Sequence, residues 1–113
     1  EEARAFARCK PLKALDVLVR ICPTAVVKIG ARGSYIKQDG LTVKVDAIEA
    51  NAQDTTGAGD LFAAGFLYGV IRGFGAEEAG QAGSILAGNV VEVVGPKMDQ
   101  QRWDEIRRRV ASL

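Results

Sequence analysis

A Gly-rich turn directly before a long apolar segment constrains this chain more than any other feature of its sequence. The turn is formed by residues 54–60 (Asp-Thr-Thr-Gly-Ala-Gly-Asp), and residues 61–71 follow with an apolar face at helical spacing. Gly57 and Gly59 open backbone conformations that are closed to other residues, so successive N–H groups can point into one concave site. Because this site lies at the start of a helix, unpaired N–H groups and the helix dipole favour a bound anion, with phosphate the obvious candidate.

Asp60 stands beside the expected anion site. A carboxylate at a helix N-terminus is stabilised in its charged form, so Asp60 is available as a general base. A base next to a phosphate cradle fits phosphoryl transfer to a hydroxyl group. The alternative is structural, with Asp60 as a plain N-cap and the glycines as a simple turn. A Walker P-loop is excluded because the Gly-Lys-Ser/Thr ending is absent, and an aspartic-protease motif is excluded because Thr56 interrupts Asp-Thr-Gly.

The pattern along the chain predicts mixed helices and strands. Helices are expected at residues 1–9, 12–21, 59–71 and 76–94, with a final helix capped by Asp99. Strands are expected at residues 25–29, 34–37 and 41–45, and the pair Asp39-Gly40 between the last two is a hairpin signal. The order of these elements predicts an α/β sandwich.

Composition excludes several classes of chemistry. The 113 residues suit one domain or part of one, and the lack of histidine excludes a histidine base. Cys9 and Cys22 are too few for a Cys/His zinc site, and without a signal peptide they fit reduced thiols in a cytoplasm. A net charge of +1 gives no reason to expect nucleic acid, and the basic residues 107–109 fit a solvated helix end. No apolar run is long enough to span a bilayer, so no membrane is expected.

Residues 54–60 match the signature D-T-x-G-A-G-D of the PfkB, or ribokinase, family of small-molecule kinases, and Phe-x-Ala-Gly at residues 62–65 also resembles that family. Residues 26–33 resemble the family's strand and Gly-x-x-Gly turn along the nucleotide. Residues 83–89 and 95–98 resemble the helix and loop beside the adenine in adenosine kinase-like members. The resemblance implies a ribokinase-like three-layer α/β/α sandwich. Residues 1–113 would be its C-terminal, nucleotide-binding part, with the N-terminal substrate and lid part missing.

The resemblance also implies roles for single residues. Asp60 would take the proton from the acceptor hydroxyl, and the N–H groups of Gly57, Ala58 and Gly59 would form an anion hole for the transferred phosphoryl group. ATP would be the donor, with Mg²⁺ carried by its phosphates. The expected nucleotide contacts are Lys28, Gly30, Gly33, Gly59 and Ser84.

Several of these roles have structural alternatives. Lys28 would lie near the phosphates or the ribose, or it is only a surface lysine at the end of a strand. Gly83 and Ala87 would make room for the base, or serve close helix packing, and both roles are compatible with each other. Asp54, Thr56 and Gly95 correspond to positions that hold a monovalent cation, typically potassium, in many members, or Asp54 only orients the turn.

The expected reaction is transfer of the γ-phosphoryl group of ATP to a hydroxymethyl group of a sugar or nucleoside. The family's Asn-x-x-Glu motif would end at Glu2, and its asparagine would precede Glu1. The acceptor pocket would lie in the missing part, as would the lid through which a homodimer would form. Two alternatives remain open, namely a nucleotide-binding but catalytically silent module and a purely structural half-domain that pairs through exposed apolar faces.

Overall fold

The computed structural model describes residues 11–95 and 97–113. The predictions for residues 1–9, which include the role of Glu2 and any contact of Cys9, lie outside the described residues. In chain order the elements are α2 (Pro11–Leu18), β1 (Thr24–Lys28), the 3-10 turn η1 (Gly30–Arg32), β2 (Ser34–Gln38), β3 (Leu41–Val45), α3 (Ala58–Ile71), α4 (Ala76–Val90) and α5 (Gln100–Ala111).

The three strands form an antiparallel sheet in the order β1-β2-β3. Asp39 and Gly40, which join β2 to β3, have φ values of 53° and 79°. Two consecutive positive φ angles are what a two-residue hairpin of matching twist requires, so the Asp-Gly hairpin prediction is confirmed.

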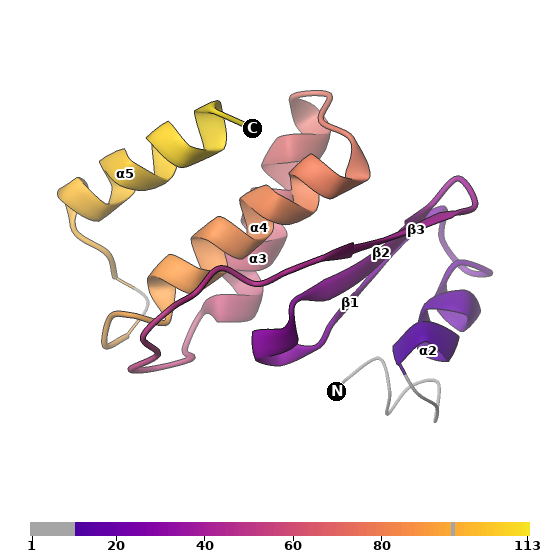
Figure 1. Cartoon of the computed structure of the whole chain (residues 1–113), viewed down its shortest axis with the longest axis horizontal. Coiled ribbons are helices and arrows are strands. Elements are labelled where there is room, and N and C mark those ends of the chain that lie inside the picture. Colours follow the sequence, from indigo (N-terminus) through magenta and orange to yellow (C-terminus); the bar gives the residue numbers. More distant parts are fainter. Residues whose placement is uncertain (1–10, 96) are drawn as a thin grey trace.

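Helices cover both faces of this sheet (Figure 1). On one face, Ala25 and Val27 of β1 pack against Ala14 and Leu15 of α2. On the other face β2 and β3 contact α4, where a Cβ atom placed on Gly80 would lie 2.5 Å from Ile36 Cδ1. The described residues therefore form a helix, sheet and helix stack, as expected for an α/β sandwich.

Helices α3 and α4 pack with their backbones in contact. A Cβ atom placed on Gly65 would lie 2.6 Å from Ala82 O, and one placed on Gly83 would lie 2.8 Å from Phe62 O. No side chain fits between the helices at these points, which accounts for the glycines in both apolar stripes. Gly83 therefore faces α3, and it is not among the residues that line the cavity described below. Its expected structural role, close helix packing, holds.

Helix α4 ends at Val90, four residues before the predicted end. In a longer helix the Gly95 N–H would donate to the Val91 carbonyl. Instead the Val91 carbonyl accepts from the N–H groups of Gln53 (2.7 Å) and Asp54 (3.0 Å), and the Gly95 N–H donates to Asp54 Oδ2 (2.8 Å). Contacts with a distant segment thus replace the last helical turn.

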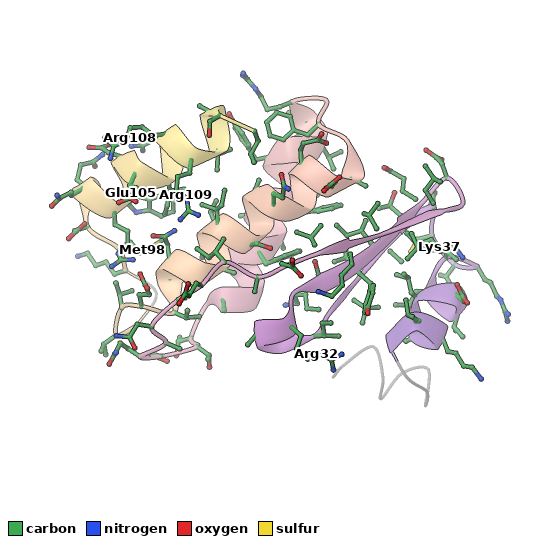
Figure 2. The ribbon with its side chains drawn as sticks, viewed as in Figure 1. Arg32, Lys37, Met98, Glu105, Arg108 and Arg109 are labelled. Carbon is green, nitrogen blue, oxygen red and sulfur yellow. The ribbon has the colours of Figure 1, made fainter. Side chains whose placement is uncertain are left out.

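Helix α5 begins as predicted, because Asp99 Oδ1 accepts from the Arg102 N–H at 2.8 Å. Ile106 and Val110 pack into a core shared with α4 and Met98. Met98, which is labelled in Figure 2, lies beside the start of α5. The arginines at the end of α5 are exposed, and Arg107 pairs with Asp104 at 3.0 Å, as the solvated-face interpretation expects. No helix in the described part of the chain is both long and apolar enough to cross a membrane.

Candidate functional site

A cavity of about 710 Å³ opens where the end of β1, the first turn of α3 and one face of α4 meet. The segment between β3 and α3, residues 46–57, is called the connecting loop, and it forms a further wall. All five residues that were expected to contact a nucleotide line this cavity: Lys28, Gly30, Gly33, Gly59 and Ser84. Residues 56 positions apart in the sequence thus come together at one site.

The α4 wall of the cavity is a stripe of small side chains. Ser84, Ala87, Gly88 and Val91 line the cavity, and their spacing places them on one side of the helix. A Cβ atom on Gly88 would collide with the Ile48 side chain, so glycine is needed for the connecting loop to approach α4. Ala87 also lines the cavity, and the small side chains of this stripe leave the space in front of α4 open.

The β1 wall is a tight turn that exposes backbone. The Ile29 N–H donates to Gly33 O (2.8 Å) and the Gly33 N–H donates to Gly30 O (3.1 Å). Gly33 has φ 99°, and a Cβ atom there would overlap Val45 O, so both conformation and packing require glycine. This turn brings main-chain atoms to the edge of the cavity without an intervening side chain.

The Gly-rich turn leads directly into α3, and Gly57 is the residue before the helix, with φ 83°. The Ala58 N–H donates to Thr55 O at 3.1 Å, so it is not a free donor for an anion. Within the described part of the chain, no acceptor is found for the N–H groups of Gly57, Gly59 and Asp60. Of the three N–H groups expected to form an anion hole, those of Gly57 and Gly59 are thus available, and the Asp60 N–H adds a further unpaired donor.

Lys28 reaches from the end of β1 to this same turn. A Cβ atom placed on Gly59 would lie 2.8 Å from Lys28 Nζ. The ammonium group therefore lies beside Gly59, in the first turn of α3. A lysine charge and a helix N-terminus act in the same direction on an anion. This position favours the phosphate interpretation of Lys28 over that of a plain surface lysine. The Asp60 side chain is exposed and follows Gly59, which lines the cavity.

Asp54 ties the turn to the segment after α4. Its Oδ1 accepts from the Thr56 N–H (2.9 Å) and hydroxyl (2.6 Å), and its Oδ2 accepts from the Gly95 N–H. The hydrogen bond from the Thr56 hydroxyl, followed by those from the Gly95 and Thr56 N–H groups, lowers the pKa of Asp54 below its ordinary value.

Asp54, Thr56 and Gly95, the three residues expected at a cation site, thus lie together. They meet because Thr56 and Gly95 donate hydrogen bonds to the Asp54 carboxylate. This arrangement matches the alternative in which Asp54 orients the turn. Among the residues that the structure describes, no three Asp, Glu, Cys or His side chains are placed to hold a metal ion together.

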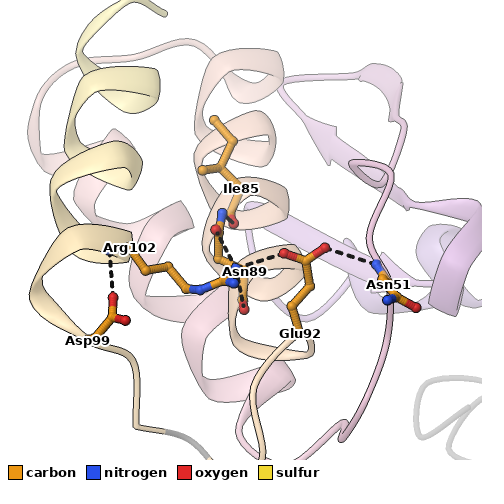
Figure 3. Close-up of polar contacts among 6 residues, drawn as sticks. All are labelled: Asn51, Ile85, Asn89, Glu92, Asp99 and Arg102. Atoms are coloured by element: carbon orange, nitrogen blue, oxygen red, sulfur yellow. Dashed lines mark hydrogen bonds and ion pairs between the residues drawn. The ribbon is translucent and has the colours of Figure 1, made fainter.

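Sequence reasoning did not single out the connecting loop as a wall of the cavity. Ala47, Ile48, Glu49, Ala50 and Ala52 all line it. Three of these five are alanines, whose side chains carry no chemical signal, and their role depends only on where the loop runs. Sequence reasoning also missed the polar contacts of Glu92 and Arg102 that hold this loop (Figure 3).

The sequence profile of the pfkB family carbohydrate kinases matches residues 1–102. The chain belongs to the PfkB family. It is 34% identical over 96 residues to a nucleoside kinase of Methanocaldococcus jannaschii, a match that covers 84% of the chain and 32% of that protein. It is 42% identical over 71 residues to an uncharacterized sugar kinase of Archaeoglobus fulgidus, which covers 63% of the chain and 28% of that protein.

Two solved kinase structures contain the same arrangement of helices and strands as this chain. A probable sugar kinase from Rhizobium etli superposes with a TM-score of 0.86 at 33% identity, over 96% of the chain and 33% of that protein. The adenosine kinase from Sinorhizobium meliloti gives a TM-score of 0.85 at 35% identity, over 96% of the chain and 34% of that protein. These matches confirm the ribokinase-like α/β fold. The chain spans about a third of the length of these PfkB relatives.

Proposed function

We propose that this PfkB chain binds ATP in the 710 Å³ cavity and directs its γ-phosphoryl group to a hydroxymethyl group of a sugar or nucleoside. The observation that carries the proposal is the meeting of Lys28 Nζ with Gly59 at the first turn of α3, beside unpaired N–H groups and Asp60. Phosphoryl transfer depends mainly on positioning and on neutralising charge, and this corner of the cavity offers both.

The nucleotide would lie across the cavity from α4 to α3. The stripe of Ser84, Ala87 and Gly88 would lie against the base, and the turn at Gly30 and Gly33 would contact the sugar and the α-phosphate. The terminal phosphates would then reach the turn before α3. There, the N–H groups of Gly57, Gly59 and Asp60 and the Lys28 ammonium would neutralise charge on the transferred group.

Asp60 would act as the general base. Its carboxylate takes the proton of the acceptor hydroxyl while the oxygen forms a bond to the γ-phosphorus. The bond from that phosphorus to the bridging oxygen breaks, and ADP leaves with the electron pair. Asp60 suits this role because it is exposed and lies one residue from Gly59, which Lys28 approaches.

Magnesium carried by the phosphates would add positive charge along the transferring group. The described residues offer it no cluster of acidic side chains, so nothing in this part of the chain is assigned as its protein ligand. A monovalent cation such as potassium near Asp54, Thr56 and Gly95 stays part of the proposal. Backbone oxygens, rather than the hydrogen-bonded Asp54 carboxylate, would supply its ligands.

The relatives support an acceptor with a hydroxyl group but differ in its class. The similar proteins are called nucleoside kinase, adenosine kinase and sugar kinase, and the chain covers about a third of each. A nucleotide-binding but silent module is the competing proposal, and it predicts ATP binding without transfer to any acceptor.

The decisive experiment replaces Asp60 with Asn in the full-length protein. If Asp60 is the base, kcat falls by at least about a hundredfold while the Kd for ATP changes less than about threefold, because the lost group acts on the acceptor. Asp104→Asn on α5 is the matched control, since Asp104 is exposed and far from the cavity. Turnover of Asp60→Asn within about tenfold of the unchanged protein contradicts the assignment of the base.

A further inference from the structure

The connecting loop is fastened at its middle by one carboxylate. Glu92 Oε2 accepts from the Asn51 N–H at 2.9 Å, across a sequence separation of 41 residues (Figure 3). Asn51 lies between Ala50 and Ala52, both of which line the cavity. The Glu92 carboxylate, which is not among the lining residues, therefore holds the loop between two residues that are.

The same carboxylate is fixed from its other side by α5. Arg102 Nη1 donates to Glu92 Oε1 at 2.7 Å and to Asn89 Oδ1 at 3.1 Å. Arg102 itself lies in the first turn of α5, where its N–H donates to Asp99 Oδ1. Both partners of the ion pair are partly buried, with about 30% of each side chain exposed, so neither moves freely.

These contacts form a continuous chain from α5 to the wall of the cavity. It runs from the Asp99 cap through Arg102 and Glu92 to the Asn51 backbone. Next along the loop, the N–H groups of Gln53 and Asp54 bond to the Val91 carbonyl. The Glu92 contact is thus a side-chain attachment at the middle of the loop, and the end of the loop is held by these main-chain bonds and by the Asp54 carboxylate, which accepts from the Gly95 N–H.

We infer that Glu92 is a positioning residue for the nucleotide: it acts through the Asn51 backbone to hold the connecting loop against the cavity, and Arg102 orients it. The inference rests on the proposed function, since it assigns this cavity to ATP. Among the described residues, the hydrogen bonds of the Glu92 side chain go to Asn51 and Arg102 and not to the Gly-rich turn or Asp60, so its effect falls on nucleotide binding and leaves the chemical step intact.

The test compares Glu92→Ala, Glu92→Gln and Arg102→Met in the full-length protein, with Asp104→Ala as the control. Asp104 also pairs with an arginine of α5, but its pair is exposed and does not reach the loop. Glu92→Ala is expected to raise KM for ATP about fivefold, the value of about one hydrogen bond, with kcat within about twofold. Glu92→Gln keeps an oxygen for the Asn51 N–H and recovers part of the loss. Arg102→Met falls between the two, and the control matches the unchanged protein.

Amide hydrogen exchange at Asn51 gives a readout that does not depend on activity. Faster exchange at Asn51 in Glu92→Ala, with unchanged exchange in the α4 core, supports the positioning role. An unchanged KM for ATP in Glu92→Ala overturns the inference while the proposed function stands. A fall in kcat and thermal midpoint together in all Glu92 variants, without rescue by Gln, also overturns it and leaves a purely structural role. If the unchanged protein does not bind ATP, the proposed function fails, and the inference falls with it.

Discussion

Replacing Gly59 with Ala separates the binding role of the first turn of α3 from its folding role. Gly59 has an ordinary helical backbone, because it is not among the residues with positive φ. The added Cβ would lie 2.8 Å from Lys28 Nζ, and apart from its chain neighbours and the nearby backbone of α3 it meets no other atom of the described residues within 4 Å. Since Nζ is the end of a flexible side chain, it can move aside. Alanine also favours a helix over glycine by up to about 1 kcal/mol. The fold is expected to be unharmed or slightly stabilised.

The same change should weaken ATP binding clearly. Displacing Lys28 removes a charge-assisted contact to phosphate worth about 1.5–3 kcal/mol, which corresponds to a rise in Kd of about 10- to 100-fold. Calorimetric titration with ATP gives Kd, and thermal unfolding without nucleotide gives stability. Lys28→Met should reproduce the loss in affinity, which ties the effect to the lysine.

Gly65→Ala is the matched control for this substitution. Its Cβ would lie 2.6 Å from the backbone oxygen of Ala82, which cannot move without separating α3 from α4. We expect this variant to be destabilised by about 1–3 kcal/mol. Unchanged ATP affinity in Gly59→Ala, with normal folding, would refute the idea that Lys28 and this turn share a phosphate.

Two further predictions concern the carboxylates behind the site. Asp54→Asn places an NH₂ group opposite either Thr56 or Gly95, both of which donate, so the thermal midpoint should fall by more than in Asp104→Asn, as measured by circular dichroism. Hydrogen bonds lower the pKa values of both Asp54 and Glu92 in the folded state, so their stabilisation is present above the ordinary carboxyl pKa of about 4 and is lost as the pH falls through the folded values. Denaturant titrations between about pH 3 and 7 should show this loss, and Glu92→Gln should flatten it; a profile identical to the unchanged protein would contradict the role of Glu92.

Local sequence signals predicted the elements that local contacts form. Asp39 and Gly40 marked the hairpin, and Asp99 marked the start of α5, because each acts on backbone groups within three residues. The Gly-rich turn was also predictable from the sequence, since Gly57 takes a conformation that few other residues adopt. For these features the physical cause and the sequence signal lie in the same short segment.

Long-range contacts decided the features that the sequence did not predict. The apolar pattern of α4 continues to Val94, but bonds from the connecting loop end the helix at Val90. Gly83 was expected to make room for a nucleotide base, because small residues suit both a ligand and a neighbouring helix. Its contact with α3 depends on where that helix lies, which the sequence does not give. The alanines of the loop wall carry no signal at all. The roles of Asp60, Lys28 and Ser84 stay predictions for the experiments above.

The main-chain bonds to Val91 and the Glu92 side-chain contact, which both hold the connecting loop, differ in how easily a substitution removes them. The bonds from Gln53 and Asp54 to Val91 use main-chain atoms only. Any residue but proline supplies the N–H groups, so replacing Gln53 with a residue other than proline, or replacing the side chain of Val91, leaves this attachment in place. The Glu92 contact can be gained or lost by one substitution. If the cavity binds ATP as proposed, one substitution at position 92 therefore changes KM for ATP while the path of the loop is kept by the bonds to Val91.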